Sequence, residues 1–204
     1  PARPLTDKEC PLDRMETLLD IRSVWIPVHE GESGDRIFRS DDGRRYAKLA
    51  DGRRAGELAG ERDRLAWLAG KGIACPEPVT WRENEQGACL IMSAIPGVPA
   101  VTLSGPDLLK AWRSMSDHLA AMHALSPDDC PFGKSLSAIV TRAADVVARD
   151  AVNPDFLPDE DKGMSGRDLL KRVEAELPQR LAQEAASLVV CHGDPCMPNF
   201  MIDP

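Results

Sequence analysis

The most informative stretch of this sequence reads HGDPCMPN, from His192 to Asn199, and it directly follows the apolar run LVVC at 188–191. The run has the composition of a β-strand, and Phe200-Met201-Ile202 is predicted to be its hairpin partner. In phosphoryl transferases an aspartate such as Asp194 orients an attacking hydroxyl and accepts its proton, while an asparagine coordinates Mg²⁺ beside the phosphate. Because Gly, Asp, Pro and Asn also form ordinary surface turns, the motif by itself leaves both interpretations open.

A lysine and a glutamate upstream supply the next two groups. Lys48 alternates with Tyr46 on one face of a strand-like segment, and Glu61 lies on or beside the apolar face of a helix predicted over 55–69. A lysine held by a helix glutamate is well placed to contact the α and β phosphates of a nucleotide. The alternative is a surface salt bridge worth at most ~1 kcal/mol. Glu57, one turn earlier, competes with Glu61 as the partner.

A glycine-rich segment, GESG at 31–34, precedes the lysine. Its backbone N–H groups are suited to covering phosphates, and the Ser33 hydroxyl is a further donor. Gly-Ser hairpin loops are common, so the segment is informative only as the first member of an ordered set. The set continues with the strand lysine, the helix glutamate and the Asp-Asn pair.

Strand-like runs bounded by Gly, Pro or Asp occupy the chain up to Met92, and Asp41-Asp42-Gly43 is a good turn between two of them. After Pro96-Gly97 apolar stripes at helical spacing predict helices instead. Together these patterns predict an α+β architecture of two lobes with a cleft. The predicted strands are 24–26, 37–38, 46–49, 79–81 and 88–92; the predicted helices begin after Ser104 and cover 136–147 and 169–177, the last interrupted by Pro178.

Composition excludes several classes of protein. The 204 residues contain 25 Lys and Arg against 33 Asp and Glu, a net charge of −8, which argues against a nucleic-acid partner. No uncharged apolar run approaches the ~20 residues that cross a bilayer, so we expect no membrane partner and a cytoplasmic location. The six cysteines form no CxxC pair and are expected to be reduced thiols. The oligomeric state stays open.

The ordered set resembles the aminoglycoside phosphotransferases, which share the protein-kinase-like fold. The resemblance rests on GESGD, Lys48, Glu61 ahead of AWL, the MSAIPG junction at 92–97 and HGDPCMPN. It covers about residues 22–204. Four further segments are most similar to the streptomycin 3''-phosphotransferases: GELAGERDRL at 56–65, PGVPA at 96–100, NPDFLPDED at 153–161 and CHGDPCMPNFM at 191–201.

The resemblance implies a two-lobed fold, with a five-stranded antiparallel N-lobe carrying one helix and a mainly helical C-lobe that is incomplete here. The expected division is a disordered tail or non-native leader at 1–14, a nucleotide-binding lobe at 15–93, a linker at 94–97 and a partial catalytic lobe at 98–204.

The resemblance also implies a reaction, the transfer of the γ-phosphate of ATP to a hydroxyl of streptomycin. Its expected cofactors are ATP and Mg²⁺. The roles carried over are Asp194 as catalytic base, His192 as a brace of its loop, Asn199 as Mg²⁺ ligand, Lys48 as phosphate contact with Glu61 as its partner, Ser33 and Gly34 over the phosphates, and Met92 to Ala94 as the linker that binds the purine.

The acidic balance fits a cationic substrate, because streptomycin carries two guanidinium groups that carboxylates bind bidentately. An acidic run in a proline-containing loop is otherwise simply solvated. The candidate substrate contacts are Asp155, Asp159, Glu160 and Asp161.

One part of the family pattern has no match. The resemblance implies a second metal-binding aspartate some distance after Asn199, and Asp203 is too close to it to take that role. We therefore expect a truncated member with little or no activity and an exposed apolar surface.

Three alternatives stay open at this point. The first is a kinase of another small hydroxyl compound, and the second is a pseudoenzyme that binds nucleotide without transfer. The third, a zinc hydrolase using Cys191, His192 and Cys196, is disfavoured because adjacent residues on an extended strand point to opposite faces. His118 and His123, five apart on a helix, do not make a metal pair either.

Overall fold

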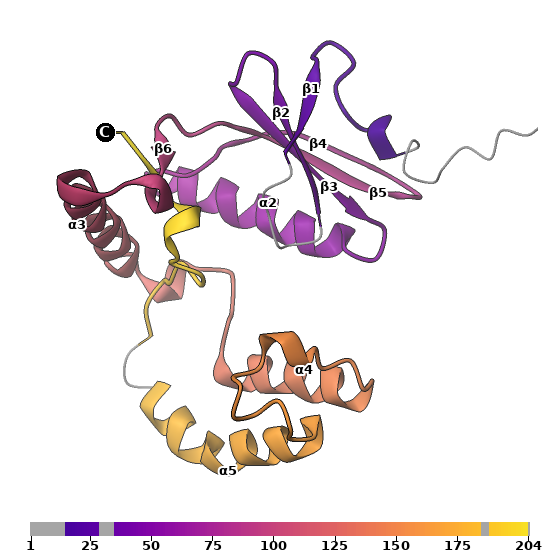
Figure 1. Ribbon diagram of the computed structural model, residues 1–204, viewed down its shortest axis with the longest axis vertical. Coiled ribbons are helices and arrows are strands. Elements are labelled where there is room, and N and C mark those ends of the chain that lie inside the picture. The colour runs from indigo at the N-terminus through magenta and orange to yellow at the C-terminus, as the bar shows by residue number, and fades with distance from the viewer. Residues whose placement is uncertain (1–14, 29–34, 185–187, 204) are drawn as a thin grey trace, which may run out of the picture. The chain divides into compact units, whose positions relative to one another are not determined.

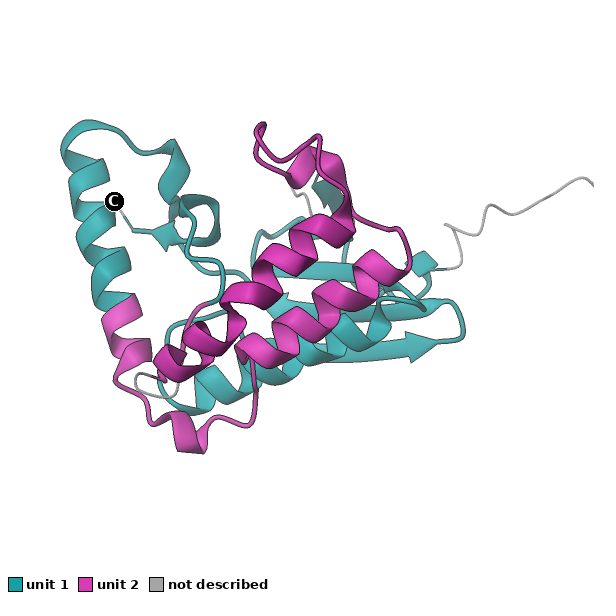
Figure 2. Cartoon of the chain, turned by 90° about the horizontal axis from the view of Figure 1, so that it is seen from below, with its two compact units in different colours: residues 1–118, 193–204 teal, residues 119–192 magenta. Residues whose placement is uncertain are grey.

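The structure, a computed structural model, describes residues 15–28, 35–184 and 188–203. The chain divides into two compact units (Figure 2): residues 1–118 with 193–204, and residues 119–192. The lobe boundaries expected from the sequence, with a linker at 94–97, stay a prediction.

An antiparallel sheet of five strands forms the main part of the first unit (Figure 1). Its order is β1-β2-β3-β5-β4, and each predicted run lies within one strand or overlaps it. The five-stranded antiparallel sheet expected from the sequence is therefore confirmed. The strands are β1 (Trp25–Val28), β2 (Arg36–Ser40), β3 (Arg45–Asp51), β4 (Pro78–Asn84) and β5 (Gly87–Ser93).

The predicted turn between β2 and β3 is present. The Gly43 N–H donates to the Ser40 carbonyl at 2.9 Å, and Gly43 has a φ of +69°. A positive φ strains residues with a Cβ, which explains the glycine at this position.

Strand β5 is buried on both faces. Cys89 and Ile91 pack with Phe38 and Leu49 on one face, while Leu90 and its neighbours form a second cluster on the other. The helix α2 (Ala55–Gly70) covers this second face, with Leu58 buried against it, as the predicted helix over 55–69 requires. The face of the sheet that carries Tyr46 is thus the one that meets α2.

The opposite face is closed by a segment for which the sequence predicted no element. Met15, Leu18 and Leu19 are buried there. Arg82 of β4 fixes this segment, because its guanidinium donates to the Leu19 carbonyl at 2.9 Å.

A small second sheet holds the end of the described chain. Strand β6 (Val98–Pro99) pairs antiparallel with β7 (Met201–Ile202). The predicted hairpin between 188–191 and 200–202 is therefore wrong, and residues 188–191 form no strand. A run of three or four apolar residues does not specify its partner, and the backbone of β7 is taken by β6.

Three longer helices follow: α3 (Gly105–His123), α4 (Leu136–Ala148) and α5 (Gly166–Glu184). Helices α4 and α5 pack against each other within the second unit. The predicted interruption at Pro178 is wrong, because α5 continues through this residue to Glu184. Proline removes one N–H from the ladder, while the turns on either side keep their own hydrogen bonds. Within the described ranges, no helix is both long and apolar enough to cross a membrane.

Candidate active site

Lys48 and Glu61 form an ion pair between β3 and α2. The Lys48 Nζ lies 2.7 Å from the Glu61 carboxylate, and the lysine side chain is 17% exposed. Strand alternation explains this contact, because Lys48 shares its face with Tyr46 and Ala50, which pack in the α2 cluster. Glu57, the competing partner, instead pairs with Arg54 at 3.3 Å. The structure thus selects Glu61.

A second carboxylate, Asp35, lies in the same cluster, and the sequence analysis did not single it out. Its Oδ2 is 3.5 Å from the Lys48 Nζ, and its Oδ1 is 2.8 Å from Arg54. The Asp35 side chain is only 6% exposed. Burial raises the pKa of Asp35 above its ordinary value, and the opposing charges of Lys48 and Arg54 offset this only in part. Asp35 is the final residue of GESGD, but a loop motif does not predict that its aspartate is buried.

Asp194 and Asn199 are joined directly. The Asn199 Nδ2 donates to the Asp194 Oδ2 at 2.9 Å and to the Asp194 carbonyl at 3.0 Å. A short helix, η4 (Met197–Asn199), creates this geometry by turning the chain back on itself. The Cys196 Sγ is 3.1 Å from the same nitrogen, and a hydrogen bond to Asp194 raises the pKa of the Cys196 thiol. Because the amide nitrogen is engaged with Asp194, Oδ1 is the Asn199 atom suited to a cation.

The segment after Asn199 contacts α3 through His118 and the chain before α3 through Ala100. Phe200 is buried and meets the His118 ring edge-on, with the ring centroids 5.8 Å apart. The Ala100 N–H donates to the Phe200 carbonyl at 2.8 Å. At Gly97 a Cβ would stand 2.4 Å from the Ile202 carbonyl oxygen, so only glycine allows the two backbones to approach. These contacts tie the Asp-Asn motif to the second sheet.

The expected purine-binding backbone is partly engaged within the protein. The Ala94 N–H donates to the Arg44 carbonyl at 2.8 Å, and the Ser93 N–H donates to the Glu77 backbone carbonyl at 2.9 Å. Met92 is buried. The Ala94 N–H therefore serves the sheet in this structure, and the role of Met92 to Ala94 stays a prediction.

Two further sets of predicted residues have different outcomes. Ser33 and Gly34 lie outside the described residues. In the acidic loop of the second unit, Asp159 pairs with Lys162 and Asp161 pairs with Arg172, both at 2.7 Å. Local cations thus balance two of the four proposed substrate carboxylates, whereas Asp155 and Glu160 are exposed. His192 lies at the end of the second unit.

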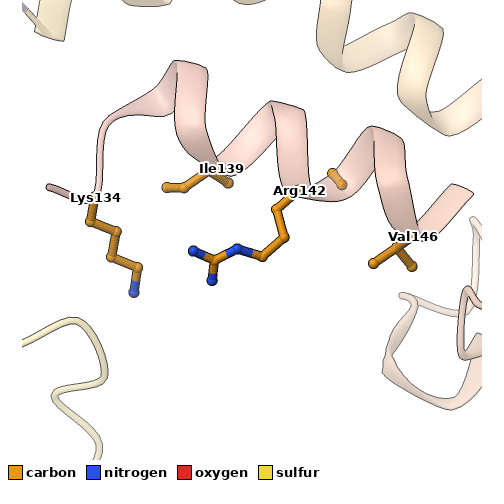
Figure 3. A pocket seen from close by; sticks show the side chains of 5 residues that line it. Lys134, Ile139, Arg142 and Val146 are labelled. Carbon is orange, nitrogen blue, oxygen red and sulfur yellow. The ribbon is translucent and has the colours of Figure 1, made fainter. Parts of the chain in front are cut away.

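A hollow of about 310 Å³ lies on α4, lined by Lys134, Ile139, Arg142, Ala143 and Val146 (Figure 3). Lysine and arginine at its wall would repel a dicationic ligand. Nowhere in the described part of the chain do three or more His, Cys, Asp or Glu side chains gather as a metal site would require. The cations that line the hollow do not support a streptomycin site at α4. The described residues do not support the zinc alternative.

Comparison with known proteins gives a consistent picture. Residues 24–204 match the model of the family described as the phosphotransferase enzyme family. Streptomycin 3''-kinase of Streptomyces griseus is 43% identical over 187 residues, which are 92% of this chain and 69% of that protein. An aminoglycoside 3'-phosphotransferase of Streptomyces fradiae is 34% identical, with 88% of this chain and 69% of that protein covered.

Solved structures agree. The aminoglycoside phosphotransferase APH(3'')-Id of Streptomyces rimosus matches with a TM-score of 0.86 at 44% identity, over 95% of this chain and 72% of that one. The same enzyme in complex with ADP and streptomycin matches with a TM-score of 0.84 at 42% identity, over 96% of this chain and 72% of that one.

Proposed function

The chain belongs to the phosphotransferase enzyme family, and from this premise we propose that it is a streptomycin 3''-kinase that uses ATP as phosphate donor. The observation that carries the proposal is that one compact unit contains both joined pairs, Lys48 with Glu61 and Asp194 with Asn199. The streptomycin 3''-kinase of Streptomyces griseus, 43% identical, supports the choice of substrate. A reaction that consumes ATP also supports the proposed cytoplasmic location.

Asp194 is the proposed catalytic base. Its carboxylate is held by the Asn199 amide at 2.9 Å, which fixes the orientation of its oxygens. The streptomycin hydroxyl oxygen attacks the γ-phosphorus of ATP while Asp194 accepts the hydroxyl proton. The bond from the γ-phosphorus to the bridging oxygen breaks, and ADP leaves with that electron pair.

The donor atoms near Asp194 suit Mg²⁺, which prefers carboxylate and carbonyl oxygens and is usually bound by one or two protein groups together with phosphate oxygens. The Asn199 Oδ1 is the proposed ligand, since the amide nitrogen is occupied. When bound, the ion neutralises the charge that develops on the phosphates.

Lys48 is the proposed contact to the α and β phosphates of the nucleotide. Glu61 at 2.7 Å restrains its flexible stem, so the ammonium is already placed before the nucleotide arrives. We also propose that His192 braces the loop and that Ser33 and Gly34 cover the phosphates.

Substrate recognition requires carboxylates for the two guanidinium groups of streptomycin. Asp155 and Glu160 are the stronger candidates of the acidic loop, because Asp159 and Asp161 already pair with Lys162 and Arg172. Exposed carboxylates without a strong local cation keep more of their attraction for a ligand.

The test separates binding from transfer. Calorimetry with Mg²⁺-ADP and with streptomycin measures binding by the 204-residue chain. Mass spectrometry with NMR of the product measures transfer and the hydroxyl modified, both in this chain, of which little or no transfer is expected, and in a chain extended at its C-terminus, in which the variants are compared. We expect Asp194→Asn to retain nucleotide binding and to lose transfer by about 10²- to 10⁴-fold, the usual contribution of a general base. Asp128→Asn, which removes an exposed carboxylate in the second unit, is the matched control. Transfer by Asp194→Asn at the original rate would show that the base is assigned wrongly, and binding of neither ligand would refute the proposal as a whole.

A further inference from the structure

The charged cluster around Lys48 contains more groups than the expected lysine-glutamate pair. Asp35 and Arg54 complete a set of two cations and two anions, so the cluster is neutral overall. Asp35 is its most buried member at 6% exposure, compared with 17% for Lys48 and 38% for Glu61. Burying a carboxylate this deeply costs free energy unless cations or hydrogen-bond donors compensate its charge.

The backbone explains how Asp35 reaches Lys48. Ile37 of β2 lies directly opposite Lys48 in the ladder, so their side chains share a face. Asp35 precedes Ile37 by two positions, and alternation directs it to the same face. Arg54, immediately before α2, closes the cluster from the helix side with a guanidinium nitrogen 2.8 Å from Asp35.

Two carboxylate partners together fix the orientation of the Lys48 ammonium group. The Lys48 Nζ has three N–H donors in fixed directions. Glu61 takes one at 2.7 Å, and Asp35 attracts a second at 3.5 Å. Two anchored directions determine the third, whereas a single partner would leave the ammonium free to rotate about one contact.

We infer that Asp35 is a positioning residue for Lys48: held in place by Arg54, it restrains the ammonium from a second side so that its third N–H faces the nucleotide phosphates. The inference rests on the proposed function in naming phosphate as the target. It adds a residue and a partner that the expected lysine-glutamate pair does not include.

The energetics of Asp35 fit a functional rather than a stabilising role. Burial raises the pKa of Asp35, and Lys48 and Arg54 reverse this only in part. A group whose pKa is raised on folding adds stability while it is protonated and loses that contribution as the pH rises through its folded-state pKa. Burial therefore costs the ionised carboxylate more than Lys48 and Arg54 return to it. Its Oδ1 also accepts no well-aligned hydrogen bond from the described residues, although Arg54 lies 2.8 Å away.

The experiment compares Asp35→Asn with Glu57→Gln. Asp35→Asn keeps the shape and removes the charge beside Lys48. Glu57→Gln removes the exposed carboxylate on the other side of Arg54, 3.3 Å from its Nε, and is the matched control. The measurements are the dissociation constant of Mg²⁺-ADP, the thermal unfolding temperature, and the exchange of Lys48 ammonium protons with water, followed by ¹⁵N NMR on lysine-labelled protein.

For Asp35→Asn we expect Mg²⁺-ADP to bind about fivefold more weakly, the size of one well-placed ion pair. The Lys48 ammonium protons should exchange faster, and the unfolding temperature should not fall. Glu57→Gln should change none of these values, while Glu61→Gln should change the first two in the same direction. A purely structural Asp35 would instead lower the unfolding temperature and leave the lysine exchange as it was.

Unchanged affinity and exchange in Asp35→Asn, with both altered in Glu61→Gln, would overturn the inference. If Asp35→Asn does not fold, the double variant Asp35→Asn with Arg54→Gln removes both charges of the pair, and the same two outcomes apply to it. If the unaltered chain binds no nucleotide, the proposed function fails, and the ammonium exchange still decides whether Asp35 restrains Lys48.

Discussion

The environment of a single residue in the five-stranded sheet depends on which face of the sheet its side chain lies on. Lys48 and Leu49 are neighbours in β3, yet Lys48 reaches a carboxylate on α2 and Leu49 is buried on the opposite face. The thirteen positions between Lys48 and Glu61 match a strand followed by one helix, which is why a pair of Lys48 with a glutamate of that helix was predictable. Asp35 was not, because its burial depends on Arg54 and on the register between β2 and β3.

Cys89 provides a prediction at the residue scale. Burial in β5 raises the pKa of its thiol to about 11. Only the thiolate reacts with alkylating agents, so at pH 8 Cys89 should remain unmodified while the exposed Cys191 reacts. Since the pKa is raised on folding, the stability that the neutral thiol contributes should decline between the ordinary thiol pKa, about 9, and about 11.

Mass spectrometry of peptides after timed alkylation measures this directly. Denaturation before alkylation is the control and should make Cys89 reactive. Modification of Cys89 at the rate of Cys191 in the folded protein would contradict the burial described for β5.

At the scale of elements, the sheet and the helix α2 were predicted well and the ends of the chain less well. The five strands have turn residues at their borders, so each could be found from local sequence alone. The run 188–191 has the same composition but no partner strand, because β7 pairs with β6, more than a hundred positions earlier. Whether a short apolar run becomes a strand is decided by such distant pairing.

The contact between β6 and β7 gives a prediction at this scale. Gly97 has a φ of +113°, and a Cβ there would lie 2.4 Å from the Ile202 carbonyl oxygen. We expect Gly97→Ala to lower the free energy of unfolding by about 1–3 kcal/mol, the range for a residue forced into a strained backbone region. Chemical denaturation followed by circular dichroism measures it.

Gly133→Ala is the matched control, because a Cβ at Gly133 meets nothing within 4 Å. Its effect should stay within about 0.5 kcal/mol, as for most surface substitutions. Equal stability of the two variants would mean that β6 and β7 do not approach as described.

At the scale of the whole molecule, charge is the property that the sequence alone supplies. The net charge of −8 attracts a dicationic antibiotic over distances beyond any single contact. Net charge is a sum over residues, so no fold is needed to know it. The local distribution is different, since Asp161 and Arg172 compensate each other only because the structure brings them to 2.7 Å.

The corresponding prediction concerns salt. Ionic strength shortens the Debye length from about 30 Å at 0.01 M to about 8 Å at 0.15 M, so added salt screens the field of the whole protein. Across this range the affinity for streptomycin should fall more steeply than the affinity for the anionic Mg²⁺-ADP. Calorimetric titrations in matched potassium chloride buffers test this, and an equal salt dependence for both ligands would contradict it.

The order of residues alone was sufficient for the five strands, for α2 and for the family, and it reduced the partners of Lys48 to Glu57 and Glu61. Each of these depends on alternation, turn chemistry or short spacing, which act over a few neighbouring residues. The partner of β7, the burial of Asp35, the engagement of the Ala94 N–H with Arg44 and the ion pairs of the acidic loop emerged only in three dimensions. Burial and hydrogen bonding between distant segments exist only once the chain has folded, and they determine which of several chemically similar side chains meet.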